Sequence, residues 1–98
     1  MPVQLSIQDA LARGQQALRA SNLAEAEQLF RAILAARPTH APALVGLGTV
    51  ALLLGHTGPA EQLFRQALAA DGASPEAHRM LGLVLEARGD FEPAIVAY

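Results

Sequence analysis

Apolar residues recur along this chain at helical spacing, in segments separated by short polar or glycine-containing breaks. Between residues 23 and 37, the apolar side chains fall on one stripe of a helix, at Ala26, Leu29, Phe30, Ile33 and Leu34. Alanine and leucine dominate and strand-forming residues are sparse, which favours helix. The pattern predicts helices over about 7–20, 23–37, 42–54, 59–70 and 75–88, and a last helix that begins at Phe91 and is cut off at Tyr98.

Residues that begin and end helices stand at the borders of these segments. Asn22 and Glu25 have the spacing of a capping box, and the pair Ser74-Pro75 supplies a good N-cap followed by a proline in the first helical position. Pro38 ends the helix before it because its ring is incompatible with a helix interior. The breaks are therefore expected to be short turns between helices.

The sequence repeats itself at an interval of 34 residues. The hexapeptide AEQLFR occurs at 26–31 and again at 60–65, and residues 7–40 laid on 41–74 without a gap give 12 identities in 34 positions. The same interval aligns small residues with small ones and aromatic residues with aromatic ones, at Gly14, Gly48 and Gly82, at Ala26, Ala60 and Ala94, and at Phe30, Phe64 and Tyr98. A fixed period of this length indicates one structural unit used repeatedly.

These residues resemble the tetratricopeptide repeat family. Its unit of 34 residues is a helix–turn–helix with small residues at positions 8 and 20, an aromatic residue at position 24 and often a proline at position 32. The aligned glycines, alanines and aromatic residues fill the first three places, and Pro38 fills the fourth once, with Gly72 there in the second copy. The chain departs from the family at position 11, where Ala17, Ala51 and Leu85 replace the usual tyrosine.

The resemblance implies an all-α fold, a right-handed superhelical stack of antiparallel helix–turn–helix hairpins. We expect one domain over 1–98, with repeat 1 at about 7–40, repeat 2 at about 41–74, and repeat 3 at about 75–98, truncated in its second helix. A glycine facing an alanine is expected to let the two helices of a hairpin approach closely, while the aromatic residue fills the space between hairpins. The expected packing residues are Gly14, Ala26, Phe30, Gly48, Ala60, Phe64, Gly82, Ala94 and Tyr98.

The resemblance also implies that the first helix of each repeat lines a concave groove, apolar in its middle and polar at its edges. An apolar stripe with a polar rim is typical of a partner site, so a peptide or an amphipathic helix of a protein partner is the expected ligand. The alternative is that the apolar members only pack on neighbouring helices. The candidate groove residues are Leu11, Gln15, Leu18, Val45, Thr49, Leu52, Arg79, Leu83 and Glu86.

Three functions are compatible with such a module. The first is a non-catalytic interaction scaffold, and the second is the N-terminal recruiting part of a larger transferase or hydroxylase. The third is self-association into a homo-oligomer, because a second copy would bury the apolar side chains of the last helix, which begins at Phe91. Family members that grip the C-terminal carboxylate of heat-shock chaperones carry Lys and Asn in the groove. Here those places hold Leu11, Gln15, Gly46, Glu76 and Met80, so that ligand is not expected.

Composition and charge exclude several kinds of partner and of chemistry. The 98 residues carry a net charge of −2 and no cysteine, which speaks against a nucleic-acid partner, disulfides and thiolate chemistry. The longest stretch without a charged residue or a histidine, 41–55, is shorter than the ~20 residues of a membrane helix, so we expect a cytoplasmic protein with no membrane partner. His40, His56 and His78 lack metal-ligand spacing, and the GxGxxA match at 46–51 lacks a preceding strand, so no metal, cofactor or catalytic residue is expected.

Overall fold

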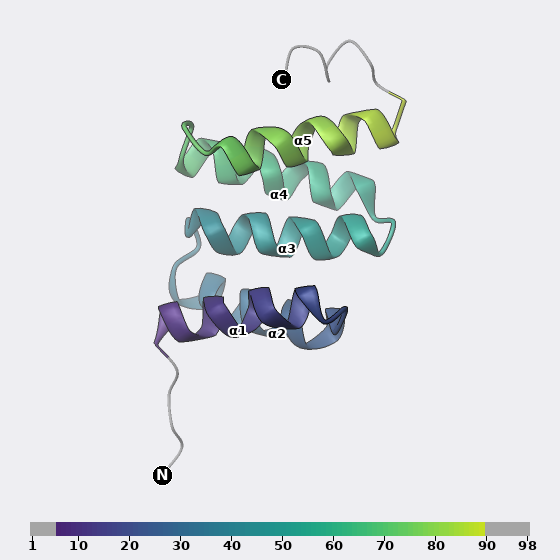
Figure 1. Cartoon of the computed structure of the whole chain (residues 1–98). Helices are drawn as coiled ribbons and strands as arrows, with labels where there is room; N and C mark the ends of the chain where they lie inside the picture. Colours follow the sequence, from purple (N-terminus) through teal and green to yellow (C-terminus); the bar gives the residue numbers. More distant parts are fainter. Residues whose placement is uncertain (1–5, 90–98) are drawn as a thin grey trace.

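The computed structural model describes residues 6–89, which form helices and turns without a strand. The helices are α1 (Ile7–Arg19), α2 (Leu23–Ala36), α3 (Ala41–Leu53), α4 (Thr57–Ala70) and α5 (Pro75–Ala87). They stack in one direction, with α1, α3 and α5 forming a front layer and α2 and α4 a rear layer (Figure 1). The predicted all-α stack of helices is confirmed, whereas the helix expected from Phe91, with Ala94 and Tyr98, lies outside the described residues.

Short side chains cap the helix starts, as the sequence predicts. Asn22 Oδ1 accepts from the backbone N–H of Glu25 at 3.4 Å, and Asn22 Nδ2 donates to the Glu25 carboxylate at 3.0 Å. Ser74 Oγ accepts from the N–H of Ala77 at 3.2 Å. The start of α4 differs from expectation: it begins at Thr57, because Pro59 sits within the first helical turn, where a missing N–H leaves no helical bond unmade.

The turn after the first helix of each repeat has the same left-handed backbone. Ser21, Gly55 and Gly89 have φ of 61°, 83° and 79°, and they stand 34 residues apart. At Gly55 the N–H bonds to the Leu52 carbonyl at 3.0 Å, and the next N–H bonds back to Ala51 at 2.8 Å. This pair of bonds is a Schellman motif, which ends a helix by satisfying its last carbonyls. The turn at Ser21 has the same two bonds with the same lengths.

The core is built around two phenylalanines that occupy equivalent positions. Phe30 and Phe64 are fully buried. A Cβ atom on Gly14 would lie 2.7 Å from the Phe30 ring, and one on Gly48 would lie 2.7 Å from the Phe64 ring. The missing side chains at these glycines make room for the aromatic ring of the same repeat, a contact that the sequence did not predict. Gly46, in the next repeat, faces the Phe30 ring even more closely, at 2.5 Å.

Helix α3 lies at the centre of the stack. It packs against each of the other four helices and contributes to both core clusters, Leu47 and Val50 to the one around Phe30 and Leu44 and Val45 to the one around Phe64. Thr49 is its one polar residue, and the Thr49 hydroxyl donates to the Val45 carbonyl at 2.8 Å. A helix in contact with neighbours on opposite sides is apolar all round, and for this reason α3 has no polar stripe.

Candidate functional site

A small cavity opens in the front layer, and we call it the front cavity. It has a volume of about 120 Å³ and joins α1, the first half of α3, the turn between α4 and α5, and the start of α5. The predicted groove residues Gln15, Leu18, Val45 and Thr49 all line it. Its full lining is Gln15, Leu18, Ala41, Pro42, Val45, Gly46, Thr49, Asp71, Ser74 and Glu76.

The floor and the rim of the front cavity differ in exposure. Val45 on the floor is 5% exposed and belongs to the core, so it supports the stack as well as lining the surface. Leu18 and Thr49 are half-buried, and Gln15 is exposed. The groove floor is thus fixed by packing, while the accessible groups stand at its edges.

The other predicted groove residues lie beside this cavity. Leu11 and Leu52 are half-buried, and each packs against a core cluster. Arg79 and Glu86 on α5 are exposed, and Leu83 between them is 40% exposed. The structure therefore divides the nine residues into a set on α1 and α3 that is packed except for the exposed Gln15, and an accessible set on α5.

The charge around the front cavity is negative. Asp71, at the end of α4, and Glu76, in the first turn of α5, line it together, and its lining contains no basic residue. Asp71 Oδ1 accepts from the backbone N–H of Ala73 at 3.2 Å, which holds the carboxylate in the turn. Glu76 is favourably placed because the N-terminus of a helix attracts negative charge.

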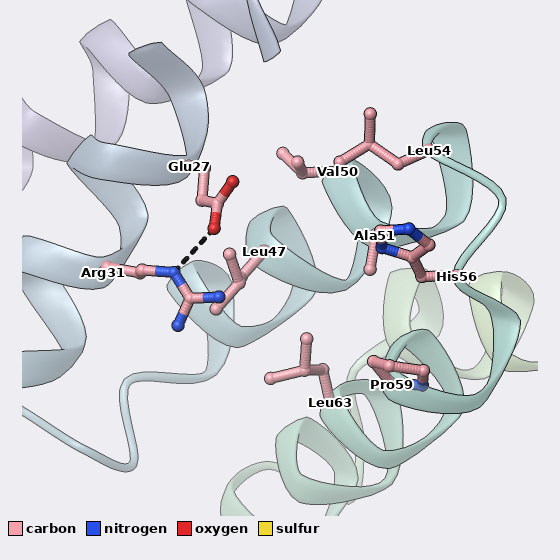
Figure 2. A pocket seen from close by; sticks show the side chains of 9 residues that line it. All are labelled: Glu27, Arg31, Leu47, Val50, Ala51, Leu54, His56, Pro59 and Leu63. Carbon is pink, nitrogen blue, oxygen red and sulfur yellow. Dashed lines mark hydrogen bonds and ion pairs between the residues drawn. The ribbon is translucent and has the colours of Figure 1, made fainter. Parts of the chain in front are cut away.

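A larger cavity, which the sequence analysis missed, lies between α2, the second half of α3 and α4 (Figure 2). We call it the rear cavity; its volume is about 300 Å³. Glu27 and Arg31 of α2 form one wall, joined by an ion pair of 2.8 Å. The full lining is Glu27, Arg31, Leu47, Val50, Ala51, Leu54, His56, Pro59 and Leu63.

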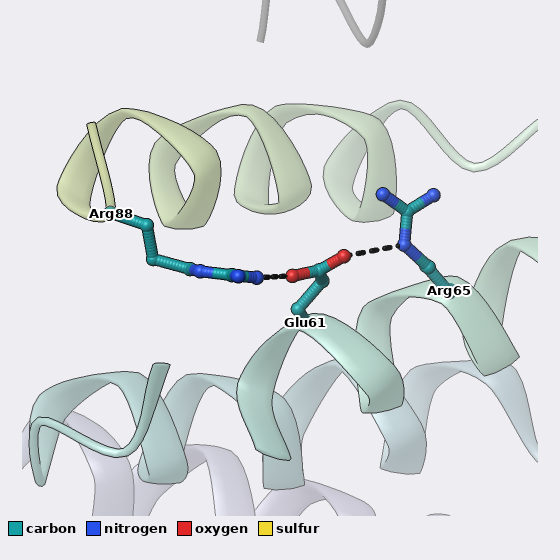
Figure 3. A network of polar contacts seen from close by, with 3 residues as sticks. All are labelled: Glu61, Arg65 and Arg88. Atoms are coloured by element: carbon teal, nitrogen blue, oxygen red, sulfur yellow. Dashed lines mark hydrogen bonds and ion pairs between the residues drawn. The ribbon is translucent and has the colours of Figure 1, made fainter. Parts of the chain in front are cut away.

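The pair of Glu27 and Arg31 recurs one repeat later as Glu61 and Arg65, again at 2.8 Å. There the glutamate has a second partner, since Oε1 of Glu61 also binds Arg88 at the end of α5 (Figure 3). The network ties α4 to α5. The sequence carries a signal for this difference, because Arg88 replaces Leu54 at the equivalent position of the next repeat.

The histidines hold structural or peripheral places. His40 caps α3, with Nδ1 at 3.2 Å from the N–H of Ala43, and a ring nitrogen of His78 lies 3.0 Å from the Gly72 carbonyl. His56 lines the rear cavity. Over residues 6–89 the structure has no cluster of three His, Asp or Glu side chains that could hold a metal ion. Within the same range, none of the helices has the length and apolar character needed to cross a membrane.

Comparisons with known proteins identify the repeat. A model of the tetratricopeptide repeat family matches residues 17–82. Among solved structures, the O-GlcNAc transferase of Thermobaculum terrenum superimposes with a TM-score of 0.90 at 31% identity, over 93% of this chain and 18% of the transferase. No curated protein matches the sequence.

Two further solved structures share the fold. MamA matches with a TM-score of 0.86 at 22% identity, over 95% of this chain and 54% of MamA. The second tetratricopeptide repeat domain of Spaghetti, solved with a bound HSP90 peptide, matches with a TM-score of 0.86 at 19% identity, over 93% of this chain and 84% of that domain. The chain thus spans about a fifth of the transferase and about half of MamA.

Proposed function

This chain belongs to the tetratricopeptide repeat family of protein-interaction modules, and we propose that its front layer binds a peptide or a short helix of a partner protein. The observation that carries the proposal is the front cavity, to which the first helices of all three repeats contribute. A ligand that enters it touches α1, α3 and α5 at once. Because α3 packs against both neighbours, the three helices present a preorganised surface, which lowers the entropy cost of binding.

The groove offers both apolar burial and orienting polar groups. Leu18 and Val45 provide an apolar floor, and the Gln15 side chain at the rim can hydrogen-bond a peptide backbone. Leu83 extends the apolar surface along α5 and is 40% exposed. A few apolar anchors surrounded by polar groups are typical of grooves that bind peptides or helices.

The charge of the front cavity argues against an acidic ligand. Asp71 and Glu76 line it, and they repel a carboxylate. The Spaghetti domain was solved with an HSP90 peptide, but its 19% identity supports a shared fold alone. The proposed ligand is therefore a neutral or basic segment rather than an acidic C-terminal tail.

The proposal is tested with paired arginine substitutions on the two layers. Gln15 and Leu83 are accessible in the groove, whereas Val45 is a core residue, so its substitution would report on folding. We expect Gln15→Arg with Leu83→Arg to abolish capture of protein partners from native lysate while helical circular dichroism is retained, because the added positive charges repel a basic segment and interrupt the apolar surface for a neutral one. The control, Gln28→Arg with Gln62→Arg, places two positive charges on exposed positions of α2 and α4 and is expected to retain capture. Equal capture by both variants would contradict binding at the front layer.

A second candidate is the recruiting module of a larger enzyme. It is favoured by the 31% identity to a segment of the O-GlcNAc transferase. In that role the front layer would still bind a protein segment, and the chemistry would reside in another domain. The encoding reading frame beyond Tyr98 tests this candidate directly: a following transferase domain supports it, and a stop codon contradicts it.

A further inference from the structure

We propose that the rear cavity receives an arginine side chain of a partner protein, in the place that Arg88 occupies one repeat further along. This site lies on a different side of α3 from the front cavity and goes beyond the proposed groove. The internal repeat carries this proposal, because both copies contain the glutamate–arginine pair and in the later copy the glutamate also binds a second arginine, Arg88.

The two copies share most of their described walls. Six of the rear-cavity residues have counterparts 34 positions later within residues 6–89, and four of these pairs are identical: Glu27 with Glu61, Arg31 with Arg65, Leu47 with Leu81, and Val50 with Val84. The glutamate–arginine distance is the same in both copies, 2.8 Å from Nε to Oε2. The two places therefore share the same leucine and valine and the same glutamate–arginine ion pair.

Among the rear-cavity positions whose counterparts lie within residues 6–89, the copies differ at two. Where the later copy has Leu85, which is buried, the rear cavity has the smaller Ala51. Where the later copy has Arg88, the rear cavity has Leu54, which carries no charge and is 48% exposed. The rear cavity thus has neither the larger leucine nor the guanidinium that the later copy carries at these two positions.

The glutamate at the open copy has an unused carboxylate oxygen. In Glu61, Oε2 binds Arg65 and Oε1 binds Arg88, and the side chain is 18% exposed. In Glu27, Oε2 binds Arg31, no partner of Oε1 is found among residues 6–89, and the side chain is 37% exposed. Because Glu61 holds two arginines at once, Arg31 does not prevent Glu27 from accepting a second one.

Arginine fits this cavity better than lysine or a purely apolar residue. Its methylene stem can lie on the apolar floor formed by Leu47, Val50 and Leu63, while its guanidinium reaches Glu27. A guanidinium is planar and more weakly hydrated than an ammonium group, so it is suited to a half-buried carboxylate. A volume of about 300 Å³ is at the lower end of ligand pockets, which suits one side chain.

The test is a titration of the methyl-labelled protein with N-acetyl-arginine amide, followed by nuclear magnetic resonance. We expect saturable shifts at the methyl groups of Val50, Leu54 and Leu63, and shifts smaller by roughly fivefold or more with the uncharged isostere N-acetyl-citrulline amide, because the pairing with Glu27 is lost. N-acetyl-lysine amide should also bind more weakly. Equal or larger shifts with N-acetyl-leucine amide would show an apolar occupant and overturn the proposal.

Three variants separate the cavity from the rest of the molecule. Leu54→Arg rebuilds the Arg88 arrangement within the chain, so it should retain the fold and abolish the arginine-dependent shifts. Glu27→Gln should weaken them by roughly fivefold, whereas Glu76→Gln, a matched change in the front cavity, should leave them unchanged. Unaltered arginine binding by folded Leu54→Arg or Glu27→Gln protein would refute the assignment, and neither result bears on the proposed groove.

Discussion

At the scale of single residues, the left-handed turn at Ser21 is costlier than its two counterparts. Gly55 and Gly89 have positive φ at equivalent positions and carry no Cβ atom. For residues with a side chain this conformation costs ~1–2 kcal/mol, because Cβ approaches the carbonyl oxygen. The two Schellman hydrogen bonds at Ser21 match those at Gly55, so the first turn keeps the same shape against its backbone preference.

Replacing this serine should stabilise the protein. We expect Ser21→Gly to raise the free energy of unfolding by about 0.5–1 kcal/mol, since the relieved strain exceeds the added entropy of the unfolded glycine. Gly55→Ala should lower it by about 1 kcal/mol, although a Cβ there would meet no atom within 4 Å. Urea denaturation of the three proteins measures both changes. Destabilisation by Ser21→Gly would show that its hydroxyl, and not its backbone, determines the turn.

The sequence predicts individual caps better than individual contacts. Asn22 and Ser74 cap helices as expected, because a cap depends on residues only three positions apart. The side chain that packs against Gly14 could not be predicted in this way. The 34-residue alignment shows which positions are small, but only the placement of α2 against α1 reveals that the Phe30 ring occupies the space.

At the scale of helices, the predicted limits agree with the structure to within about two residues, because glycine, proline and capping residues mark nearly every border. The rear cavity was not predictable from periodicity. It exists because Leu54, at the end of α3, does not reach across to Glu27 as Arg88 reaches across to Glu61. Such a difference depends on side chains from separate helices, which no pattern within one helix reports.

The close contact between α3 and α4 should make Ala60 intolerant of bulk. Ala60 is fully buried, so Ala60→Phe must separate the two helices, and we expect a loss of ~1–3 kcal/mol or more in the free energy of unfolding. Ala69, exposed on the same helix, provides the control, and Ala69→Phe should change stability by less than about 0.5 kcal/mol. Thermal unfolding compares them. An unchanged melting temperature for Ala60→Phe would contradict the tight crossing.

At the scale of the whole molecule, stability should be greatest in the middle. Within residues 6–89, helix α3 packs against every other helix, whereas α1 packs against α2 and α3, and α5 against α3 and α4. In a linear array each unit is supported by its neighbours, so a terminal unit can open while the rest stays folded.

Amide hydrogen exchange should show this order directly. We expect the amides of α3 to exchange at least about tenfold more slowly than those of α1, because opening α3 disrupts both core clusters. Exchange measured residue by residue under native conditions gives the comparison. Equal protection in α1 and α3 would instead indicate that all the helices unfold together as one cooperative unit.

The close fit of the Phe30 ring against Gly46 also limits how the array could be lengthened by design. One repeat later the position of Gly46 is taken by Met80, a buried member of the core around Phe64. A second copy of residues 41–74 spliced in after the first would put a glycine beside Phe64 and leave a hollow that methionine now fills. The middle repeat therefore cannot be duplicated unchanged. A lengthened array must carry a large residue, as Met80 does now, at the position that follows Phe64 in the next repeat.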